Sequence, residues 1–543
     1  MVEKCWVVLN ETGKDLREIL IKNRDIRDPD SFFKPHLYKL TPPDKLFSDL
    51  ERAVERIKQA IKNKELVYIY GDFDVDGITA TAILWETVHF LGGNVLPFIP
   101  HREKEGYGIH ADTLEKLAKE GAKVIVSVDC GITAVEEAEI ARKLGVDLII
   151  TDHHLIQKTI PKPFALLHCD KLAGAGVAFM LAKALLEAFH KKDDEQLYAN
   201  LGLAGIGTIA DMVPLTGDNR IITVNGLYNL SNTKRIGLKS LYDEAAITKS
   251  IGTYEVGFII APRLNAAGRL EHAMDSLRLL LTRKKGRAQE ITSKLSETNK
   301  KRQEATTSAL SHARELISGN GASKILIAHH PTYQQGVVGL VAGRLVDENY
   351  KPAIVISETS PISKGSARSI SGFNITDAIK SASKYLESAG GHPMAAGFSI
   401  EQTKIPHFKK EVSGYAEKNL AKKNLTPTLK VDTQLGNGSI NYKTLEILRQ
   451  FEPFGIGNPE PVFLTKNLQV KDVRRLGREG KHLRLVLRSP EDFVYDAIGF
   501  GMGETSVKIG DRIDTVYNAR ENNWQGNKKL ELKLKDFRPA EKN

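Results

Sequence analysis

The stretch Tyr68-Ile-Tyr-Gly-Asp-Phe-Asp-Val-Asp-Gly77 joins an apolar strand candidate to three closely spaced carboxylates. Carboxylates at alternate positions after a strand, here Asp72, Asp74 and Asp76, can converge on a hard divalent cation, and the glycine that follows permits a sharp turn. The same letters open a calcium loop of the EF-hand type, but no glutamate occupies the twelfth loop position and an apolar helix pattern follows over 78–91. A metal site is therefore predicted here, with a solvated acidic turn as the alternative.

Two further β-branched runs end in residues that can bind a metal. Residues 123–128 run into Asp129, and residues 147–150 lead through Thr151 to Asp152-His153-His154. Helical patterns alternate with these strands, which indicates an α/β domain with a mostly parallel sheet. Because ligands of such sheets bind outside the carboxyl ends of the strands, we expect the three segments to converge on one edge.

A fourth acidic candidate is Asp211, which closes a run of small residues over 202–210. An isolated aspartate after a buried helix is also a common cap for the next segment. The three acidic strand ends favour a metal-binding role over capping. We assign no chemical role to residues 212–262.

Composition agrees with a polyanionic partner. The chain has 77 basic and 67 acidic residues among 543, a net charge of +10 and a pI of about 9.1. Its three cysteines lack metal-ligand spacing and imply a reducing compartment. No secretory signal pattern or membrane-spanning apolar run is present, so a cytoplasmic protein is expected.

The length requires several domains, because single cores stop growing at about 250 to 300 residues. A charged, proline-free helix pattern over 284–317 separates the first α/β region from a second one. Five short strand candidates with glycine turns follow after residue 423 and indicate a small barrel. The expected parts are a catalytic domain (1–283), a connecting helix (284–320), a smaller α/β domain (321–423) and an OB-fold barrel (424–543).

The order and spacing of four motifs resemble the DHH phosphoesterase superfamily: Asp72–Gly77, Val128-Asp-Cys-Gly131, Asp152-His-His154 and Ile209-Ala-Asp211. Four more motifs extend the resemblance over nearly the whole chain, at 262–269, 335–344, 390–397 and 453–461. The resemblance implies a DHH domain, a DHH-associated domain (321–423) with the glycine pair of 390–397, and an OB-fold. Within this superfamily, the sequence resembles the branch that degrades single-stranded DNA.

Hydrolysis of a phosphodiester requires a nucleophilic water and compensation of the charge on the phosphoryl oxygens, which two metal ions supply. For this chemistry, the resemblance implies that Asp129, a single aspartate directly after the central strand, bridges the two ions. The other ligands implied are Asp74, Asp76, His153 and Asp211, with Asp72, Asp152 and His154 in support. The imidazole favours Mn²⁺, although Mg²⁺ also suits the carboxylates.

The resemblance also implies a pocket for a terminal 5′ phosphate. The residues carried over motif by motif are Arg102, Arg269, Ser366 and Arg368, with His392 near the scissile phosphate and both His154 and His392 among the catalytic residues. Arginine suits this task because its guanidinium stays charged and grips phosphate with two hydrogen bonds. An ordinary surface salt bridge is the alternative for each arginine.

The barrel region carries a basic cluster that indicates single-strand binding: Arg474, Arg475, Arg478, Lys481, His482 and Arg484. Tyr517 and Trp524 are the candidate stacking residues. A charged hairpin with core aromatics is the alternative.

The function expected from the resemblance is a 5′ to 3′ exonuclease for single-stranded DNA that releases 5′-mononucleotides in repair and recombination. Single-strand-binding protein is the expected partner. One alternative is a relative that cleaves short oligonucleotides, cyclic dinucleotides or pyrophosphate, against which the barrel argues. The other is a non-catalytic DNA-binding scaffold, against which the complete ligand set argues.

Overall fold

The computed structural model describes residues 3–10, 15–191, 195–318, 323–420, 426–524 and 527–540. They form two compact units. We call residues 24–299 with 449–460 the N-terminal unit, and residues 1–23, 300–448 and 461–543 the C-terminal unit. In the described part of the chain, no helix is both long and apolar enough to span a bilayer.

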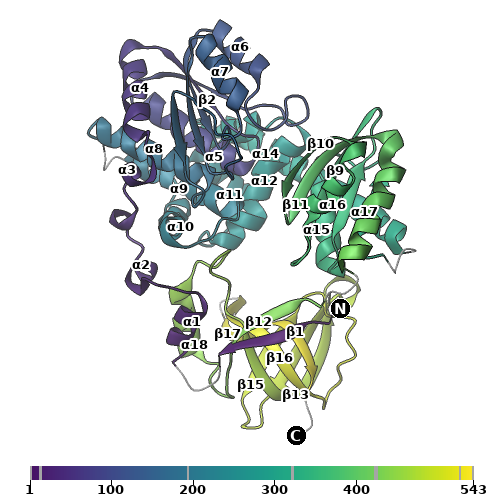
Figure 1. Ribbon diagram of the computed structural model, residues 1–543. Helices are drawn as coiled ribbons and strands as arrows, with labels where there is room; N and C mark the ends of the chain where they lie inside the picture. The colour runs from purple at the N-terminus through teal and green to yellow at the C-terminus, as the bar shows by residue number, and fades with distance from the viewer. Residues whose placement is uncertain are drawn as a thin grey trace. The chain divides into compact units, whose positions relative to one another are not determined.

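The N-terminal unit is built on a five-stranded parallel sheet (Figure 1). Its strand order is β3-β2-β4-β5-β6, and every neighbouring pair is parallel. The strands are β2 (Leu66–Tyr70), β3 (Asn94–Phe98), β4 (Ala122–Val128), β5 (Asp147–Asp152) and β6 (Ala165–His168). The parallel α/β sheet predicted from the alternating pattern is confirmed.

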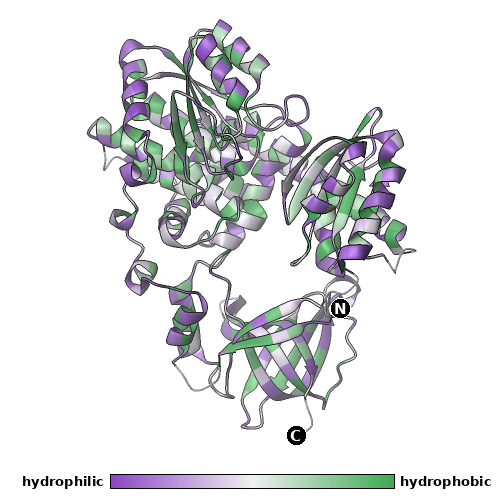
Figure 2. Ribbon diagram, viewed as in Figure 1, coloured by the Kyte–Doolittle hydropathy of each residue, from purple (hydrophilic) through white to green (hydrophobic). Residues whose placement is uncertain are grey.

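Helices cover both faces of this sheet, and the inner strands β2, β4 and β5 are buried on both sides, as parallel strands generally are. One face packs Val67, Ile69 and Val126 against α4, α5, α8 and α9, and the other packs Tyr68 and Ile125 against α6 and α7. Figure 2 shows the resulting hydrophobic strands and the two-toned helices around them. The helix bounds are α2 (Pro29–Phe33), α3 (Pro43–Leu46), α4 (Leu50–Asn63), α5 (Val75–Phe90), α6 (Ala111–Lys119), α7 (Val135–Lys143), α8 (Gly174–Ala188), α9 (Glu195–Ala210), α10 (Gly217–Ser231), α11 (Ile236–Glu244), the π-helix η2 (Glu255–Ile260), α12 (Ala261–Leu270) and α13 (Met274–Leu281).

A single helix, α14 (Lys285–Ser318), begins in the N-terminal unit and ends in the C-terminal unit. Its 34 residues span about 51 Å at 1.5 Å per residue. Ala288, Ile291 and Leu295 are buried near its start, and Ala309 and Leu310 near its end. The connecting helix expected over 284–317 is therefore present, anchored by apolar residues at each end.

The C-terminal unit contains a mixed sheet of order β10-β11-β9-β8-β7, in which only β7 and β8 pair in parallel. Its strands are β7 (Leu326–His330), β8 (Ala353–Ser357), β9 (Ile362–Arg368), β10 (Leu386–His392) and β11 (Ala395–Glu401). The helices packed with it are α15 (Val338–Asn349), α16 (Ile375–Ser381) and α17 (Ile405–Leu420).

A closed five-stranded barrel completes this unit. The strands β13 (Phe463–Leu476), β14 (His482–Arg488), β15 (Val494–Gly499), β17 (Asn527–Pro539) and β16 (Arg512–Trp524) follow one another, and a β13–β16 pairing closes the ring. The predicted barrel is confirmed. Two further strands pair in parallel beside it, β1 (Cys5–Asn10) and β12 (Thr428–Gln434), flanked by α1 (Leu16–Asn23) and α18 (Tyr442–Phe451).

Two segments cross the expected domain boundaries. Residues 1–23 lie with the barrel because β1 hydrogen-bonds along β12, and residues 449–460 lie in the N-terminal unit. A parallel pairing across more than 400 residues of chain leaves no local pattern in the sequence. The division into four consecutive domains stays a prediction, to which the structure adds this exchange of segments.

Candidate metal centre

Asp74 and Asp76 take different positions at the junction of β2 and α5. The carboxylate of Asp74 caps α5, accepting hydrogen bonds from the backbone N–H groups of Asp76 (2.9 Å) and Gly77 (3.1 Å). The carboxylate of Asp76 is buried and accepts from the N–H groups of Gly174 (2.6 Å) and Ala175 (2.8 Å), at the start of α8. Each carboxylate is therefore oriented by a helix N-terminus.

Asp129 leaves the end of β4 in a strained conformation. Its φ of +60° lies in the left-handed region, which few non-glycine residues adopt. Two glycines make room for the buried carboxylates. A Cβ on Gly174 would lie 2.5 Å from Asp129 Oδ1, and a Cβ on Gly207 would lie 2.5 Å from Asp76 Oδ1. Neither role can be read from the sequence, because a glycine at a helix position indicates nothing about the carboxylate it faces.

His153 brings the acidic residues of three segments together. Its Nε2 lies 3.2 Å from Asp129 Oδ1 and 3.8 Å from a carboxylate oxygen of Asp76. Asp211, which follows α9, places an oxygen 3.8 Å from the same nitrogen. Residues from β4, β5, α5 and α9 therefore meet at the edge predicted from the strand ends.

Among the described residues, three sets of potential ligand atoms each lie within 4.8 Å of one another. They are Asp129 with His153 and His154, Asp76 with His153 and Asp211, and Asp72 with Asp74 and Asp129. Asp129 and His153 each belong to two sets. Each of the five predicted ligands belongs to at least one set, and so do Asp72 and His154, which the sequence placed only in support.

The polar atoms at the centre of this cluster fit a cation. Asp72 Oδ1, Asp129 Oδ1 and His153 Nε2 are buried, and none has a hydrogen-bond partner in the described part of the protein. Buried polar atoms are normally paired, so lone pairs left open at one point indicate a missing positive partner. Carboxylate oxygens with one imidazole suit Mn²⁺ and accommodate Mg²⁺.

The electrostatics of the cluster lead to the same conclusion. Burial and neighbouring carboxylates raise the pKa of Asp72, Asp76 and Asp129 well above the usual range. Burial, together with Asp74, raises the pKa of Asp211 to about 7. Burial lowers the pKa of His153 to about 4, which leaves a neutral imidazole at pH 7. Bound divalent cations stabilise a cluster of closely spaced carboxylates such as this one.

Asp152 holds the histidine pair rather than facing the cluster. One carboxylate oxygen accepts from the backbone N–H groups of His153 (2.7 Å) and His154 (3.1 Å), and the other accepts from Ile132 N–H (2.8 Å). The same carboxylate lies 2.8 Å from Nδ1 of His154, which is also 3.0 Å from the hydroxyl of Tyr107. The geometry favours a supporting position for Asp152 and adds Tyr107, whose contact the sequence did not indicate.

Helix α12 and Arg102 lie against residues 71–74, the loop between β2 and α5 that we call the metal loop. Asn265 on α12 accepts a hydrogen bond from Val75 N–H (3.1 Å), and a Cβ on Gly268 would lie 2.2 Å from the Phe73 carbonyl oxygen. Arg102 stacks its guanidinium 4.9 Å from the centre of the Phe73 ring. The structure therefore places Arg102 and the helix that carries Arg269 at this loop.

Ser366, Arg368 and His392 lie in the C-terminal unit. Arg368 donates a hydrogen bond to Ser366 Oγ (3.0 Å) on the same strand, β9. A Cβ on Gly339, near the start of α15, would lie 3.0 Å from that hydroxyl and 3.1 Å from Arg368 Nη2. A serine, an arginine and a helix N-terminus thus converge, as anion sites require. His392 ends β10 and is exposed.

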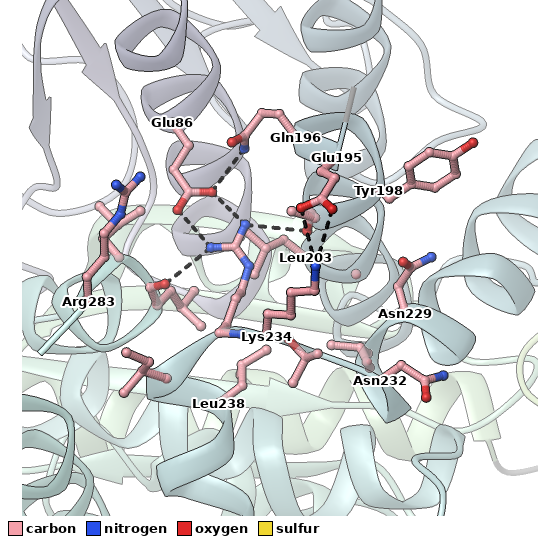
Figure 3. A pocket seen from close by; sticks show the side chains of 18 of the residues that line it. Glu86, Glu195, Gln196, Tyr198, Leu203, Asn229, Asn232, Lys234, Leu238 and Arg283 are labelled. Carbon is pink, nitrogen blue, oxygen red and sulfur yellow. Dashed lines mark hydrogen bonds and ion pairs between the residues drawn. The ribbon is translucent and has the colours of Figure 1, made fainter. Parts of the chain in front are cut away.

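A pocket of about 850 Å³ in the N-terminal unit is separate from this cluster (Figure 3). It is lined by Glu86 from the far end of α5 and by Glu195 and Gln196 from the far end of α9. A partly buried ion pair between Glu86 and Arg235 crosses it. Glu86 lies ten positions after Asp76 in α5, about 15 Å along the helix, so this pocket does not share the metal cluster.

Comparisons with known proteins extend over nearly all of the chain. Family models match for the N-terminal domain of the DHH family at residues 66–206, the DHHA1 domain at 322–418 and the RecJ OB domain at 431–536. These assignments agree with the three predicted domain types.

Relatives named single-stranded-DNA-specific exonuclease RecJ match at several levels of identity. The protein of Bacillus subtilis is 38% identical over 91% of this chain, which spans 64% of that relative's length. The protein of Thermus thermophilus is 33% identical, covering 92% of this chain and 73% of its own. The protein of Escherichia coli is 30% identical over 92% and 91% of the two chains.

A solved structure agrees with the fold. The crystal structure of RecJ in complex with Mn²⁺ from Thermus thermophilus superposes with a TM-score of 0.85 at 30% identity, covering 97% of this chain and 76% of that one. A second, in complex with Mg²⁺, gives a TM-score of 0.78 at 28% identity, over 97% and 75%. Together with its three domain matches and its metal cluster, this likeness shows that the chain belongs to the RecJ family of DHH exonucleases.

Proposed function

We propose that this chain is a metal-dependent exonuclease that hydrolyses single-stranded DNA from the 5′ end and releases 5′-mononucleotides. The observation that carries the proposal is the buried cluster in which Asp129 belongs to two ligand sets and has a carboxylate oxygen without a hydrogen-bond partner among the described residues. A shared carboxylate is what a two-metal phosphodiesterase needs between its ions.

The ligands of the proposed centre are Asp74, Asp76, Asp129, His153 and Asp211. These side chains would hold two divalent ions, Mn²⁺ or Mg²⁺, which would lower the pKa of a water and compensate the charge on the phosphoryl and leaving oxygens. Asp72 is included as a further candidate ligand, since its open oxygen lies within the same cluster.

His154 is proposed to donate a hydrogen bond to the substrate phosphate. Burial lowers its pKa, but the hydrogen bond and charge of Asp152, together with the charges of Asp211 and Asp76, outweigh burial and leave the pKa raised. The protonated ring is then favoured, and Asp152 fixes its orientation. His392 of the C-terminal unit is proposed as a second contact to the scissile phosphate.

The direction of digestion is attributed to a site for the terminal 5′ phosphate. Arg102, which stacks on Phe73, and Arg269 of α12 would contribute, together with Ser366 and Arg368 of β9. Planar guanidinium groups grip a terminal phosphate with paired hydrogen bonds, which an internal phosphodiester satisfies less fully. A 5′-phosphorylated strand is therefore the proposed substrate.

The test is digestion of single-stranded and duplex DNA labelled at either end, with Mn²⁺ or with a chelator. A 5′ label is expected to appear at once as a mononucleotide, and a 3′ label to persist in shortening fragments. Duplex DNA should resist, and the chelator should stop the reaction. Cleavage confined to dinucleotides, or preference for the duplex, would show that the substrate is another one.

The barrel is proposed to hold the strand beyond the cleavage site. Tyr517 cannot serve as the expected stacking platform: it is fully buried, and its hydroxyl lies 2.7 Å from that of Thr465 in the barrel core. The side chain of Trp524 lies outside the described part of the structure. Arg474, Arg478 and Lys481 are exposed, so they carry the proposed contact with DNA.

Replacing Arg474, Arg478 and Lys481 with alanine is expected to weaken binding of long single strands and to flatten its salt dependence. Each lost phosphate contact removes about 0.7 from the slope of log K against log salt, about 2 for all three. Anisotropy titrations of labelled oligonucleotides, with a chelator present and at several salt concentrations, measure the binding affinity and its salt dependence. The matched control replaces three exposed basic residues of α6 and α7, namely Lys116, Lys119 and Arg142. Equal slopes for the two triple variants would remove the barrel from the binding site.

A substrate of single-stranded DNA also gives the proposal its cellular setting. Repair and recombination, a cytoplasmic location and contact with single-strand-binding protein follow as parts of the same proposal. Immunoprecipitation of the chain with and without nuclease treatment tests the protein contact.

A further inference from the structure

A short segment from beyond α14 packs into the N-terminal unit. Residues 449–460 lie between α18 and β13 in sequence, yet they belong with residues 24–299. Within the segment, Gly455 and Asn458 bond each other through N–H and C=O groups at 2.9 and 3.2 Å, which closes a tight turn. We call residues 455–458 the docked turn.

The docked turn lies on the loop that follows the metal-site residue Asp211. The carbonyl of Ile456 accepts a hydrogen bond from Leu215 N–H at 2.7 Å. A Cβ on Gly455 would lie 2.6 Å from the end of the Leu215 side chain, and one on Gly457 would lie 3.0 Å from Pro214. The turn therefore fits against residues 214–216 with no room for added atoms.

Buried polar contacts hold the docked turn in place. Asn458 is completely buried, and its amide nitrogen donates to the carbonyls of Phe451 (2.7 Å) and Pro453 (2.9 Å). Its amide oxygen accepts from Arg24 Nε (3.1 Å). Asn458 therefore connects the docked turn to the preceding residues of its segment and to Arg24 at the start of the unit.

Arg220, on α10, fixes the start of the same segment. Its guanidinium is buried and donates to the carbonyls of Phe32 (2.8 Å), Phe451 (3.2 Å) and Glu452 (2.8 Å). The ring of Phe451 packs edge-on against Phe33 at 5.1 Å. The attachment is thus apolar as well as polar.

The backbone N–H of Asp211 donates to the Gly207 carbonyl at 2.9 Å, so α9 fixes one side of the residue and the loop 211–216 fixes the other. Its carboxylate accepts no hydrogen bond from any described residue, whereas that of Asp76 accepts two from α8. Only residues 211–216 separate α9 from α10, and Met212 within them has a φ of +64°. Because this loop has only six residues and one of them is in the left-handed region, a displacement of Leu215 is transmitted along the backbone to Asp211.

We propose that the docked turn positions Asp211 for metal binding by fixing the loop 211–216. The C-terminal half of the chain would thereby complete a metal site whose ligands all come from the N-terminal half. This inference rests on the proposed function, because Asp211 is a metal ligand only within it. Asn458 and Gly457 are positioning residues, since neither touches the metal cluster.

The principal test variant is Gly457→Ala. Gly457 has a φ of +74°, and an added methyl would press on Pro214. Gly145→Ala is the matched control in the same unit, because Gly145 has a φ of +68° and open space around its Cβ position. Both changes carry the same backbone cost, and only the first disturbs the loop of Asp211.

Mn²⁺ binding by the whole chain is the readout, measured by electron paramagnetic resonance or calorimetry without DNA. Gly457→Ala is expected to weaken one of two sites by about 10- to 100-fold, the range typical of residues that orient a ligand. Activity should require correspondingly more Mn²⁺ and recover at saturation, and Gly145→Ala should match the wild type. If Gly457→Ala does not fold, Gly455→Ala decides, because its methyl meets only the flexible end of Leu215.

Unchanged Mn²⁺ affinity in folded Gly457→Ala or Gly455→Ala would overturn the positioning role. The outcome is separable from that of the proposed function. If the wild-type chain binds Mn²⁺ and the variants weaken it, but no DNA is cleaved, the proposed activity fails while the positioning holds. If DNA is cleaved and the variants bind Mn²⁺ as the wild type does, only the positioning fails.

Discussion

Asp129→Asn is expected to lower the rate of single-strand hydrolysis by at least about 10³-fold while the protein still folds and binds DNA. The amide keeps the size of the carboxylate but loses the charge that two ligand sets share. A metal centre contributes several kcal/mol to transition-state stabilisation, and about 4 kcal/mol corresponds to 10³-fold in rate.

The measurement is single-turnover digestion of a 5′-phosphorylated oligonucleotide at saturating Mn²⁺, with DNA affinity followed separately in chelator. Asp112→Asn on α6 is the control, because Asp112 is exposed and belongs to none of the three ligand sets. Turnover within tenfold of the wild type would take Asp129 out of the bridging position.

Gly174→Ala should have nearly as large an effect, although position 174 carries no functional group. The added methyl would lie 2.5 to 2.7 Å from three side-chain atoms of Asp129, so the carboxylate must move. Displacing a catalytic group by about 1 Å can cost about 10²-fold in rate. Alanine is a better helix former than glycine, so α8 itself should not be weakened.

Gly286→Ala near the start of α14 is the matched control, because nothing lies within 4 Å of its Cβ position. Rates at saturating Mn²⁺ and thermal unfolding of both variants separate a local displacement from a loss of fold. A Gly174→Ala variant with wild-type rates would mean that the Asp129 carboxylate can shift without consequence.

The metal centre could be predicted from the sequence because each of its segments has a local signature. A β-branched run followed at once by Asp129, or by Asp152-His153-His154, places the side chain at a strand end whatever the rest of the chain does. The barrel and the long helix were predictable for the same reason, since strand length and helical charge pattern are local properties.

Features that depend on contacts between distant segments could not be predicted. Gly174 and Gly207 are required by carboxylates that reach them through space, and the docked turn meets a loop 240 residues earlier in the chain. Tyr517 was misplaced because a strand residue faces either the core or the solvent, and its neighbours in sequence did not decide which. The sequence predicts only a supporting position for Asp72, because its distance from Asp129 depends on how the site folds.

The pairing of β1 with β12 limits how the chain can be divided. A barrel fragment beginning near residue 424 would lack β1, and the backbone groups of β12 that face it would become an open edge able to pair with other molecules. A fragment that stops before residue 449 would leave Arg220 without two of its three carbonyl partners. Fragments for complementation should therefore be chosen by the two units, with residues 3–23 kept beside the barrel and 449–460 supplied to the N-terminal unit.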